Sequence, residues 1–170
     1  GRIFRNNAVF SGKGIPQISA IMGNCVAGGG YLPVLCDVLL MTEGSGLYLA
    51  GPALVKAAIG QEVSSEELGG AKMHAEISGT IDFREPNDEA CLQRMRSLMA
   101  KHQVAKALAV APNAVAQPTR AGAEVYDIFR GDLAKSYDMK ELLECFVDGG
   151  SFDEYRAEFG RSLMCGYANI

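Results

Sequence analysis

Three consecutive glycines at 28–30 follow closely on an apolar run that ends at Met22. Glycine loses more backbone entropy on folding than any other residue and buries little surface, so such a run is costly. The apolar residues at 16–23 predict a buried strand, and residues 31–37 predict a short helix after the glycines. We therefore expect either a sharp, tightly packed turn or a stretch of main chain that a ligand can touch.

Composition excludes several classes of protein. The chain has 170 residues, 48% hydrophobic and 21% charged, which suits one soluble globular domain with a core. The net charge of -4 and the lack of a Lys/Arg cluster argue against a nucleic-acid surface. No apolar stretch is long enough to span a bilayer, and the first residues lack the apolar segment of a signal peptide.

The cysteines are scattered and lack the CxxC spacing of zinc sites. Their odd number and irregular spacing indicate buried thiols in a reduced compartment rather than a disulfide framework. Only two histidines occur, so we expect no multi-histidine metal site and no bound metal. The five cysteines are Cys25, Cys36, Cys91, Cys145 and Cys165.

Short apolar runs alternate with helical patterns, which predicts an α/β class. Ser64 with Glu67 three residues later has the form of a capping box, and Pro52 and Gly60 suit the two ends of the preceding helix. Residues 103–135 lack periodicity and read as a long connection. Further strands are expected at 38–42, 46–50, 79–83 and 162–170, and helices at 1–12, 52–60, from 64, 87–102, 138–147 and from 151.

A second glycine pair, Gly69–Gly70, follows beside a predicted helix end. The first glycine run is not a P-loop, because no Lys-Ser/Thr follows, and its spacing differs from the dinucleotide-binding fingerprint. Two bare turns could each offer one N–H to the same carbonyl oxygen, which would stabilise an enolate. The competing interpretation of the second pair is a helix C-cap.

Three segments carry a family resemblance: "IPQISAIMGNCVAGGGYLPVLCD", "LYLAGPALVKAAIGQEVSSEELGGAKMHAEISG" and "ELLECFVDGGSFDEYRAEFGRSLMCGYANI". They resemble the carboxyltransferase (β) subunits of biotin-dependent acyl-CoA carboxylases, and "LAGPALVKAA" looks more like the methylcrotonyl-CoA branch. The resemblance implies a crotonase-like fold of the crotonase superfamily, here as a partial domain of stacked short strands flanked by helices.

The family's organisation implies that residues 1–170 are the later part of an N-terminal, acyl-CoA-binding domain. The biotin-side C-terminal domain is absent, and we expect a longer native polypeptide. By resemblance, the whole enzyme moves a carboxyl group from carboxybiotin to an acyl-CoA, and biotin itself takes the proton. We therefore expect no carboxyl transfer by this chain alone.

The same resemblance implies the surroundings of the protein. Biotin would be attached to a carrier protein or domain, not to this chain, and a biotin carboxylase/biotin carrier subunit would be the partner. Full-length subunits would form a trimer or hexamer, without nucleic acid or membrane. The compartment would be the cytoplasm, or the mitochondrial matrix in a eukaryote.

Backbone N–H groups are expected to hold the thioester enolate. The resemblance implies that these donors are among Val26, Ala27, Gly28, Gly29, Gly69 and Gly70, and the sequence does not select individual N–H groups from this set.

Four further residues have two interpretations each. Tyr31 would line the acyl pocket or pack in the core, and Lys56 would meet a CoA phosphate or lie on a solvated helix face. Cys25 invites interpretation as a nucleophile, but no His/Asp partner is evident and the chemistry needs no covalent step. For His74 we favour a structural role, in which its ring satisfies backbone groups.

Other functions remain open from the sequence. A carboxyltransferase subunit of a glutaconyl-CoA-type decarboxylase would run the chemistry in reverse and have a membrane partner. A non-catalytic remnant or interaction module would keep the fold's contacts and bind CoA thioesters weakly. A crotonase-type hydratase or isomerase would need a placed carboxylate, for which Glu66 or Glu67 would have to serve.

Overall fold

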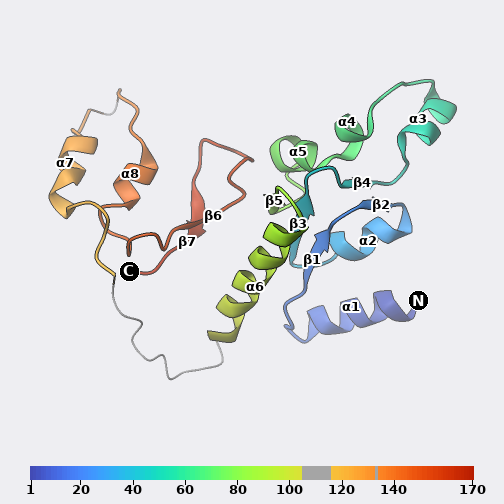
Figure 1. Ribbon diagram of the computed structural model, residues 1–170, viewed down its shortest axis with the longest axis horizontal. Helices are drawn as coiled ribbons and strands as arrows, with labels where there is room; N and C mark the ends of the chain where they lie inside the picture. Colours follow the sequence, from blue (N-terminus) through green and yellow to red (C-terminus); the bar gives the residue numbers. More distant parts are fainter. Residues whose placement is uncertain (105–115, 133) are drawn as a thin grey trace. The chain divides into compact units, whose positions relative to one another are not determined.

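A computed structural model describes residues 1–104, 116–132 and 134–170, which fall into two units (Figure 1). The first unit contains residues 1–104 together with Glu158–Gly160. The second contains the described residues from 116 to 157 together with Arg161–Ile170.

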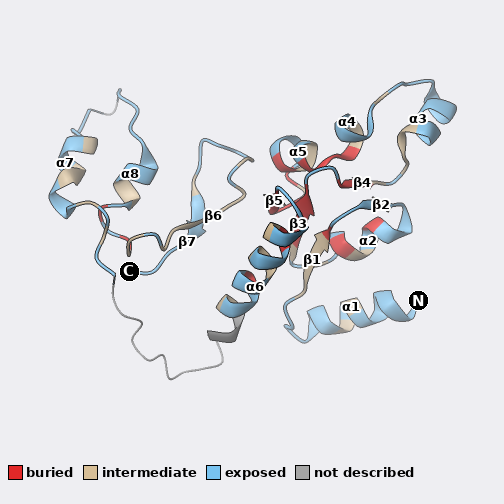
Figure 2. Ribbon diagram, in the orientation of Figure 1, coloured by how far each residue is buried: buried red, intermediate tan, exposed pale blue. Residues whose placement is uncertain are grey.

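A three-stranded parallel sheet forms the centre of the first unit. Its order is β1 (Ile18–Ile21), β3 (Val38–Thr42) and β5 (Phe83–Glu85). The predicted strands at 16–23 and 38–42 are thus confirmed. The middle strand β3 is apolar from Val38 to Met41 and ends in the buried Thr42, as suits a parallel strand covered on both faces, and buried residues gather around it (Figure 2).

A second parallel pair joins β2 (Asn24–Val26) to β4 (Gly46–Tyr48). The strand at β4 was predicted, whereas β2 was not, because three residues give no readable alternation. Helix α2 (Gly28–Val34) begins within the glycine run rather than after it. The first N–H groups of a helix have no partner within the helix, so α2 itself does not pair the N–H groups of Gly28 and Gly29.

Four of the remaining helices of the first unit begin within one residue of the predicted start, whereas the two short helices between Ala71 and Ser78 were not predicted. Pro52 begins α3 (Pro52–Ile59), and Gly60 ends this helix with a left-handed φ of +73°. At the start of α6 (Asp88–Val104), the Asn87 carboxamide oxygen accepts the Ala90 N–H at 2.9 Å. The helices are α1 (Arg2–Gly12), α3 (Pro52–Ile59), α4 (Ser65–Gly69), α5 (Ala71–Met73), the π-helix η1 (His74–Ser78) and α6 (Asp88–Val104).

The predicted strand at 79–83 is wrong except for its last residue. Gly79 ends the π-helix with a φ of +64°, and Asp82 bonds β3 through both its main chain and its side chain. The Asp82 N–H donates to the Leu39 carbonyl at 2.8 Å, and its carboxylate accepts the Leu39 N–H at 2.8 Å. Because a side chain takes the place of a ladder partner, regular pairing begins only at Phe83.

The capping box at the start of α4 is confirmed. The Glu67 N–H donates to the Ser64 hydroxyl at 3.2 Å, and the Ser64 N–H donates back to the Glu67 carboxylate at 3.0 Å. The hydrogen bond from the Ser64 side chain, followed by that from its backbone, lowers the pKa of Glu67.

Ser64→Ala is expected to cost about 1 kcal/mol of unfolding free energy, the usual value of a serine cap. The pKa of Glu67 should rise in this variant, measured by carbon-13 NMR titration. Because the folded pKa is lowered, the pair stabilises the fold at neutral pH, and this contribution is lost as the pH falls through the folded pKa. If the pKa of Glu67 were the same in Ser64→Ala, the Ser64 hydrogen bonds would not be the cause of its lowered pKa.

Arg84 of β5 pairs with two carboxylates that are distant in sequence. Its guanidinium forms ion pairs with Glu43 and Glu158. These pairs, with the Glu158 hydrogen bond as the largest cause, raise the pKa of Arg84. Beside them, the Phe159 ring lies against Gly79, where an added Cβ would come within 2.8 Å of it. The segment Glu158–Gly160 is therefore tied to the first unit.

The second unit contains short elements. Asp138 caps α8 as predicted, accepting the Lys140 N–H at 2.8 Å, although the helix ends at Leu143 rather than continuing to 147. Part of the predicted connection at 103–135 holds η2 and α7, and residues 105–115 and 133 lie outside the described residues. The elements are η2 (Gly122–Glu124), α7 (Val125–Ile128), α8 (Met139–Leu143), β6 (Asp153–Tyr155) and β7 (Cys165–Tyr167).

The predicted helix from Ser151 is wrong. Residues there form β6, which pairs antiparallel with β7 in the register Tyr155↔Cys165. Arg156 follows with a φ of +53°, which ends regular structure. The strand expected at 162–170 is confirmed at β7 (Cys165–Tyr167), which pairs with the preceding strand β6.

Candidate functional site

The turn between β2 and α2 contains a strained residue, Ala27, with φ 52° and ψ −124°. Residues with a side chain rarely adopt this region, which favours glycine. The Ala27 N–H donates to the Tyr48 carbonyl at 3.0 Å, and the Ala27 carbonyl accepts the Gly30 N–H at 3.0 Å. Hydrogen bonds on both sides thus hold a sharp strand-to-helix elbow.

The elbow presents unpaired N–H groups. Within the described part of the chain, the N–H groups of Gly28 and Gly29 donate to no backbone oxygen. Both residues are exposed at the N-terminus of α2, the positive end of its helix dipole. Val26, the last residue of β2, is exposed as well. Among the predicted donors, the structure therefore leaves Gly28 and Gly29 available and already engages Ala27.

The second glycine turn packs against the same strand. Gly70 forms an isolated antiparallel bridge with Gly46 of β4, and its N–H donates to the Glu66 carbonyl at 3.0 Å. It is also the C-cap of α4, in an extended rather than a left-handed conformation. At the buried Gly69, an added Cβ would overlap the Leu47 carbonyl oxygen. Gly69 therefore permits a close backbone approach, and the N–H of Gly70 is occupied.

Leu47 and Tyr48 of β4 link the two turns, and sequence reasoning did not identify them. The Leu47 side chain lies against Gly30, where an added Cβ would come within 2.9 Å of its Cδ1. The Tyr48 hydroxyl donates to the Asn24 carboxamide oxygen at 3.0 Å. No local sequence signal marks these residues, because their role depends on the pairing of β2 with β4.

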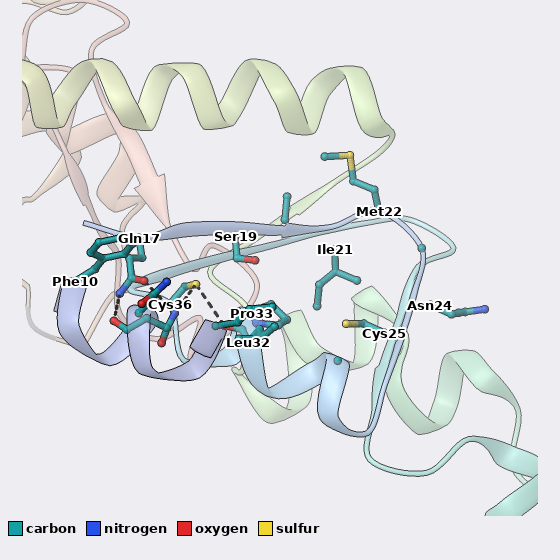
Figure 3. A pocket seen from close by; sticks show the side chains of 16 residues that line it. Phe10, Gln17, Ser19, Ile21, Met22, Asn24, Cys25, Leu32, Pro33 and Cys36 are labelled. Carbon is teal, nitrogen blue, oxygen red and sulfur yellow. Dashed lines mark hydrogen bonds between the residues drawn. The ribbon is translucent and has the colours of Figure 1, made fainter. Parts of the chain in front are cut away.

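An open cleft of about 680 Å³ adjoins the elbow (Figure 3). It lies among α1, β1 and the start of α2, with Cys25 and Ile21 at one end and Phe10 and Gln17 at the other, and Gly29 is also among the residues that line it. No aspartate, glutamate, histidine, lysine or arginine is among the described residues that line it. The cleft thus offers a neutral, largely apolar surface without a side-chain acid or base.

The two cysteines in the cleft have no activating partner in the described structure. Burial raises the pKa of the Cys36 thiol, which favours its protonated form and weakens it as a nucleophile. The half-buried Cys25 packs against the core cluster of the first unit. The His74 ring is engaged elsewhere, with Leu47 and Ser78, so it does not serve as a base for Cys25.

Tyr31 and Lys56 lie outside this cleft. Tyr31 is 52% exposed on α2, so it does not pack in the core of this unit. Lys56 forms an ion pair with Glu62, and its side chain is 63% exposed. Neither side chain is among the described residues that line the cleft.

Among the described residues, no group of three or more histidine, cysteine, aspartate or glutamate residues is arranged to hold a metal ion. None of the helices in the ranges that the structure describes combines the length and apolar character needed to cross a membrane.

Comparisons with known proteins agree over the whole chain. Residues 1–170 match the family model "Carboxyl transferase domain". The chain is 40% identical to the probable mitochondrial methylcrotonoyl-CoA carboxylase beta chain of Drosophila melanogaster, covering 100% of this chain and 32% of that protein. It is 37% identical to a biotin-dependent 3-methylcrotonyl-coenzyme A carboxylase beta1 subunit of Mycobacterium tuberculosis, again covering 100% and 32%.

A solved structure shows the fold. Transcarboxylase 12S with methylmalonyl-coenzyme A and methylmalonic acid bound matches with a TM-score of 0.80 and 32% identity, over 100% of this chain and 33% of that one. The fold is therefore crotonase-like, as predicted. The chain spans about a third of the length of the relatives named here. With its full length matched by one family model, the chain belongs to the carboxyl transferase domain family.

Proposed function

We propose that this chain forms the acyl-CoA-binding part of a carboxyltransferase that transfers a carboxyl group from carboxybiotin to an acyl-CoA of the methylcrotonyl-CoA class. The observation that carries the proposal is the elbow at Ala27, which exposes the Gly28 and Gly29 N–H groups without presenting a nucleophile. Family membership and the methylcrotonyl-CoA carboxylase relatives support the choice of reaction and acyl group.

The chemistry of such a transfer explains why an elbow without a nucleophile is useful. Loss of a proton from the carbon conjugated with a thioester places negative charge on the carbonyl oxygen. Fixed N–H donors stabilise that charge more than they stabilise the neutral thioester, which lowers the barrier. In α/β-hydrolases, a similarly strained elbow carries a nucleophilic serine, and the N–H after it is an oxyanion donor. Here alanine stands at the elbow, and Gly28 follows it.

Gly28 and Gly29 would then bind the thioester oxygen, with the Gly69–Gly70 turn supporting the site from the other side of β4. The neutral cleft beside Gly29 suits an acyl group, since it is concave and largely apolar. Its lack of a charged base fits a reaction in which the chain positions the substrate and stabilises charge. Carboxybiotin, when present, supplies the carboxyl group and accepts the proton, and we assign no residue of this chain to it.

The whole protein is proposed to work with a biotin carboxylase/biotin carrier partner and as a homo-oligomer. The Mycobacterium relative is described as a subunit of a biotin-dependent carboxylase, and transcarboxylase 12S is described as a hexamer assembly. A soluble compartment, the mitochondrial matrix in a eukaryote, suits these partners, since the Drosophila relative is named as mitochondrial.

Binding of two matched ligands tests the thioester site. By calorimetry, methylcrotonyl-CoA should bind this chain about tenfold more tightly than a thioether analogue in which CH₂ replaces the carbonyl, the value of about one hydrogen bond. Equal affinities would contradict a carbonyl-binding elbow. Binding of neither ligand would favour the interaction-module alternative.

The isolated chain should show no carboxyl transfer from free carboxybiotin, because it spans only about a third of the length of the carboxylase subunits that it resembles. Incubation with carbon-14-labelled carboxybiotin and methylcrotonyl-CoA, followed by chromatography, measures this directly. Labelled acyl-CoA above a protein-free control would show that the chain needs no further domain for turnover.

A further inference from the structure

We propose that His74 is a positioning residue for the thioester site, acting through the Leu47 carbonyl to hold β4 between the two glycine turns. The inference deepens the proposed function, since it concerns the same N–H donors. It assigns a role to a side chain that does not line the cleft.

Both nitrogens of the His74 ring form hydrogen bonds. Its Nε2 lies 2.8 Å from the Leu47 carbonyl oxygen, and its Nδ1 lies 2.9 Å from the Ser78 hydroxyl. A carbonyl oxygen can only accept, so Nε2 must carry the proton. In the neutral ring, Nδ1 then accepts from Ser78. The network thus fixes one tautomer and one orientation of the imidazole.

The local structure that presents His74 is a π-helix. The π-helix His74–Ser78 joins α5 to the turn at Gly79. The Ser78 hydroxyl lies 2.8 Å from the Thr80 hydroxyl and accepts the Thr80 N–H at 3.3 Å. A π-helical turn is rare and is often found at functional sites. Here it places a hydrogen-bonded Ser78–Thr80 pair behind the ring.

Residues Leu47 and Tyr48 of β4 connect the His74 hydrogen bond to the elbow at Ala27. Gly69 approaches the Leu47 carbonyl so closely that no side chain fits, and Gly30 lies against the Leu47 side chain. The next carbonyl along β4, that of Tyr48, accepts the Ala27 N–H at 3.0 Å. Leu47 therefore separates the two turns as a spacer, and His74 anchors its carbonyl from the far side of β4.

The hydrogen bond from His74 to the Leu47 carbonyl helps to hold the N–H donors of the elbow in place. The strained Ala27 conformation persists only while its surroundings hold it. If the Leu47 carbonyl loses its partner, β4 gains freedom, and the Tyr48–Ala27 hydrogen bond that orients the Gly28 N–H opens more often. Misplacement of a donor reduces binding of the thioester oxygen, while contacts to the rest of the ligand remain.

Two His74 variants test this in the intact 170-residue chain. His74→Phe keeps a ring of similar size without a donor, and His74→Gln keeps an amide N–H that can reach the Leu47 carbonyl. For His74→Phe we expect the affinity ratio of methylcrotonyl-CoA to its thioether analogue to fall about three- to tenfold. His74→Gln should restore part of that ratio. Ser151→Ala, a hydroxyl deletion in the second unit, is the control and should leave the ratio unchanged.

Amide hydrogen exchange gives a readout that needs no ligand. His74→Phe should speed exchange of the Ala27 N–H selectively, relative to amides of β3, and nitrogen-15 NMR should show the Nε2–H tautomer in the unmodified chain. A uniform loss of stability with an unchanged ligand ratio would reduce His74 to a structural residue and overturn the proposal.

The failure of the proposed function is distinguishable from failure of this inference. If the unmodified chain does not prefer the thioester over the thioether, the proposed function fails. The exchange measurement then decides the positioning role alone, and unchanged Ala27 protection in His74→Phe overturns it.

Discussion

Gly69→Ala is expected to destabilise the first unit by about 3 kcal/mol, a large share of the stability of a typical domain. A Cβ at this position would overlap the Leu47 carbonyl oxygen and the Tyr48 ring. The ring could rotate away, but the carbonyl belongs to the main chain of β4 and accepts the His74 hydrogen bond. The strand must therefore shift as a whole, and urea denaturation followed by circular dichroism should show a lower midpoint.

The neighbouring glycine is the matched control. At Gly70, which is buried, the three atoms nearest an added Cβ all belong to the carboxylate of Glu66, an exposed and flexible side chain. Its φ of −71° and ψ of 163° suit alanine as well as glycine. Gly70→Ala should therefore lower the unfolding free energy much less than Gly69→Ala does, because a flexible side chain can move where a strand carbonyl cannot. Equal losses in the two variants would show that the close approach at Leu47 does not limit residue 69.

Removal of the Gly28 N–H should lower kcat of the assembled carboxylase by a factor of about 100 to 1,000, the usual loss for one oxyanion donor. Gly28→glycolic acid, introduced as an α-hydroxy acid, replaces the amide nitrogen by an ester oxygen and adds no bulk. The loss in kcat should exceed the loss in affinity for the acyl-CoA, because charge on the thioester oxygen is greatest in the transition state.

The same ester at Gly150, an exposed glycine of the second unit, controls for the chemistry of the replacement. An ester at 28 also weakens the Ala27 carbonyl as an acceptor for Gly30, so the denaturation midpoint is measured in parallel. An unchanged kcat in a stable Gly28 ester would remove this N–H from the proposed site.

Local signals in the sequence predicted much of the first unit. Ser64, Asn87 and Gly60 mark helix ends through hydrogen bonds to nearby residues, and Pro52 marks a helix start through its fixed backbone angle; each of these predictions is confirmed. The errors occur where partners are distant. Residues 79–82 look like a strand, but the Asp82 carboxylate takes a ladder position opposite Leu39, 43 residues away.

The candidate site shows the same division. The glycine pattern and the resemblance identify both turns, because glycine content is visible in the sequence. Occupancy of each N–H is not visible there. Ala27 and Gly70 are engaged by Tyr48 and Glu66, while Gly28 and Gly29 are not engaged by a backbone oxygen of the described chain. That distinction depends on the pairing of β2 with β4 and on the short helix before Gly70.

The ion pair between Arg84 and Glu158 has a consequence for synthesis on the ribosome. Arg84 is translated well before Glu158, so the first unit forms this ion pair only after the ribosome has added residues 85–158. Until then Arg84 has Glu43 as its ionic partner, and Gly79 lacks the Phe159 ring. Complete folding of this unit thus requires three residues that are translated late, Glu158–Gly160. A nascent chain arrested before them would lack the Arg84–Glu158 ion pair and the packing of Phe159 against Gly79.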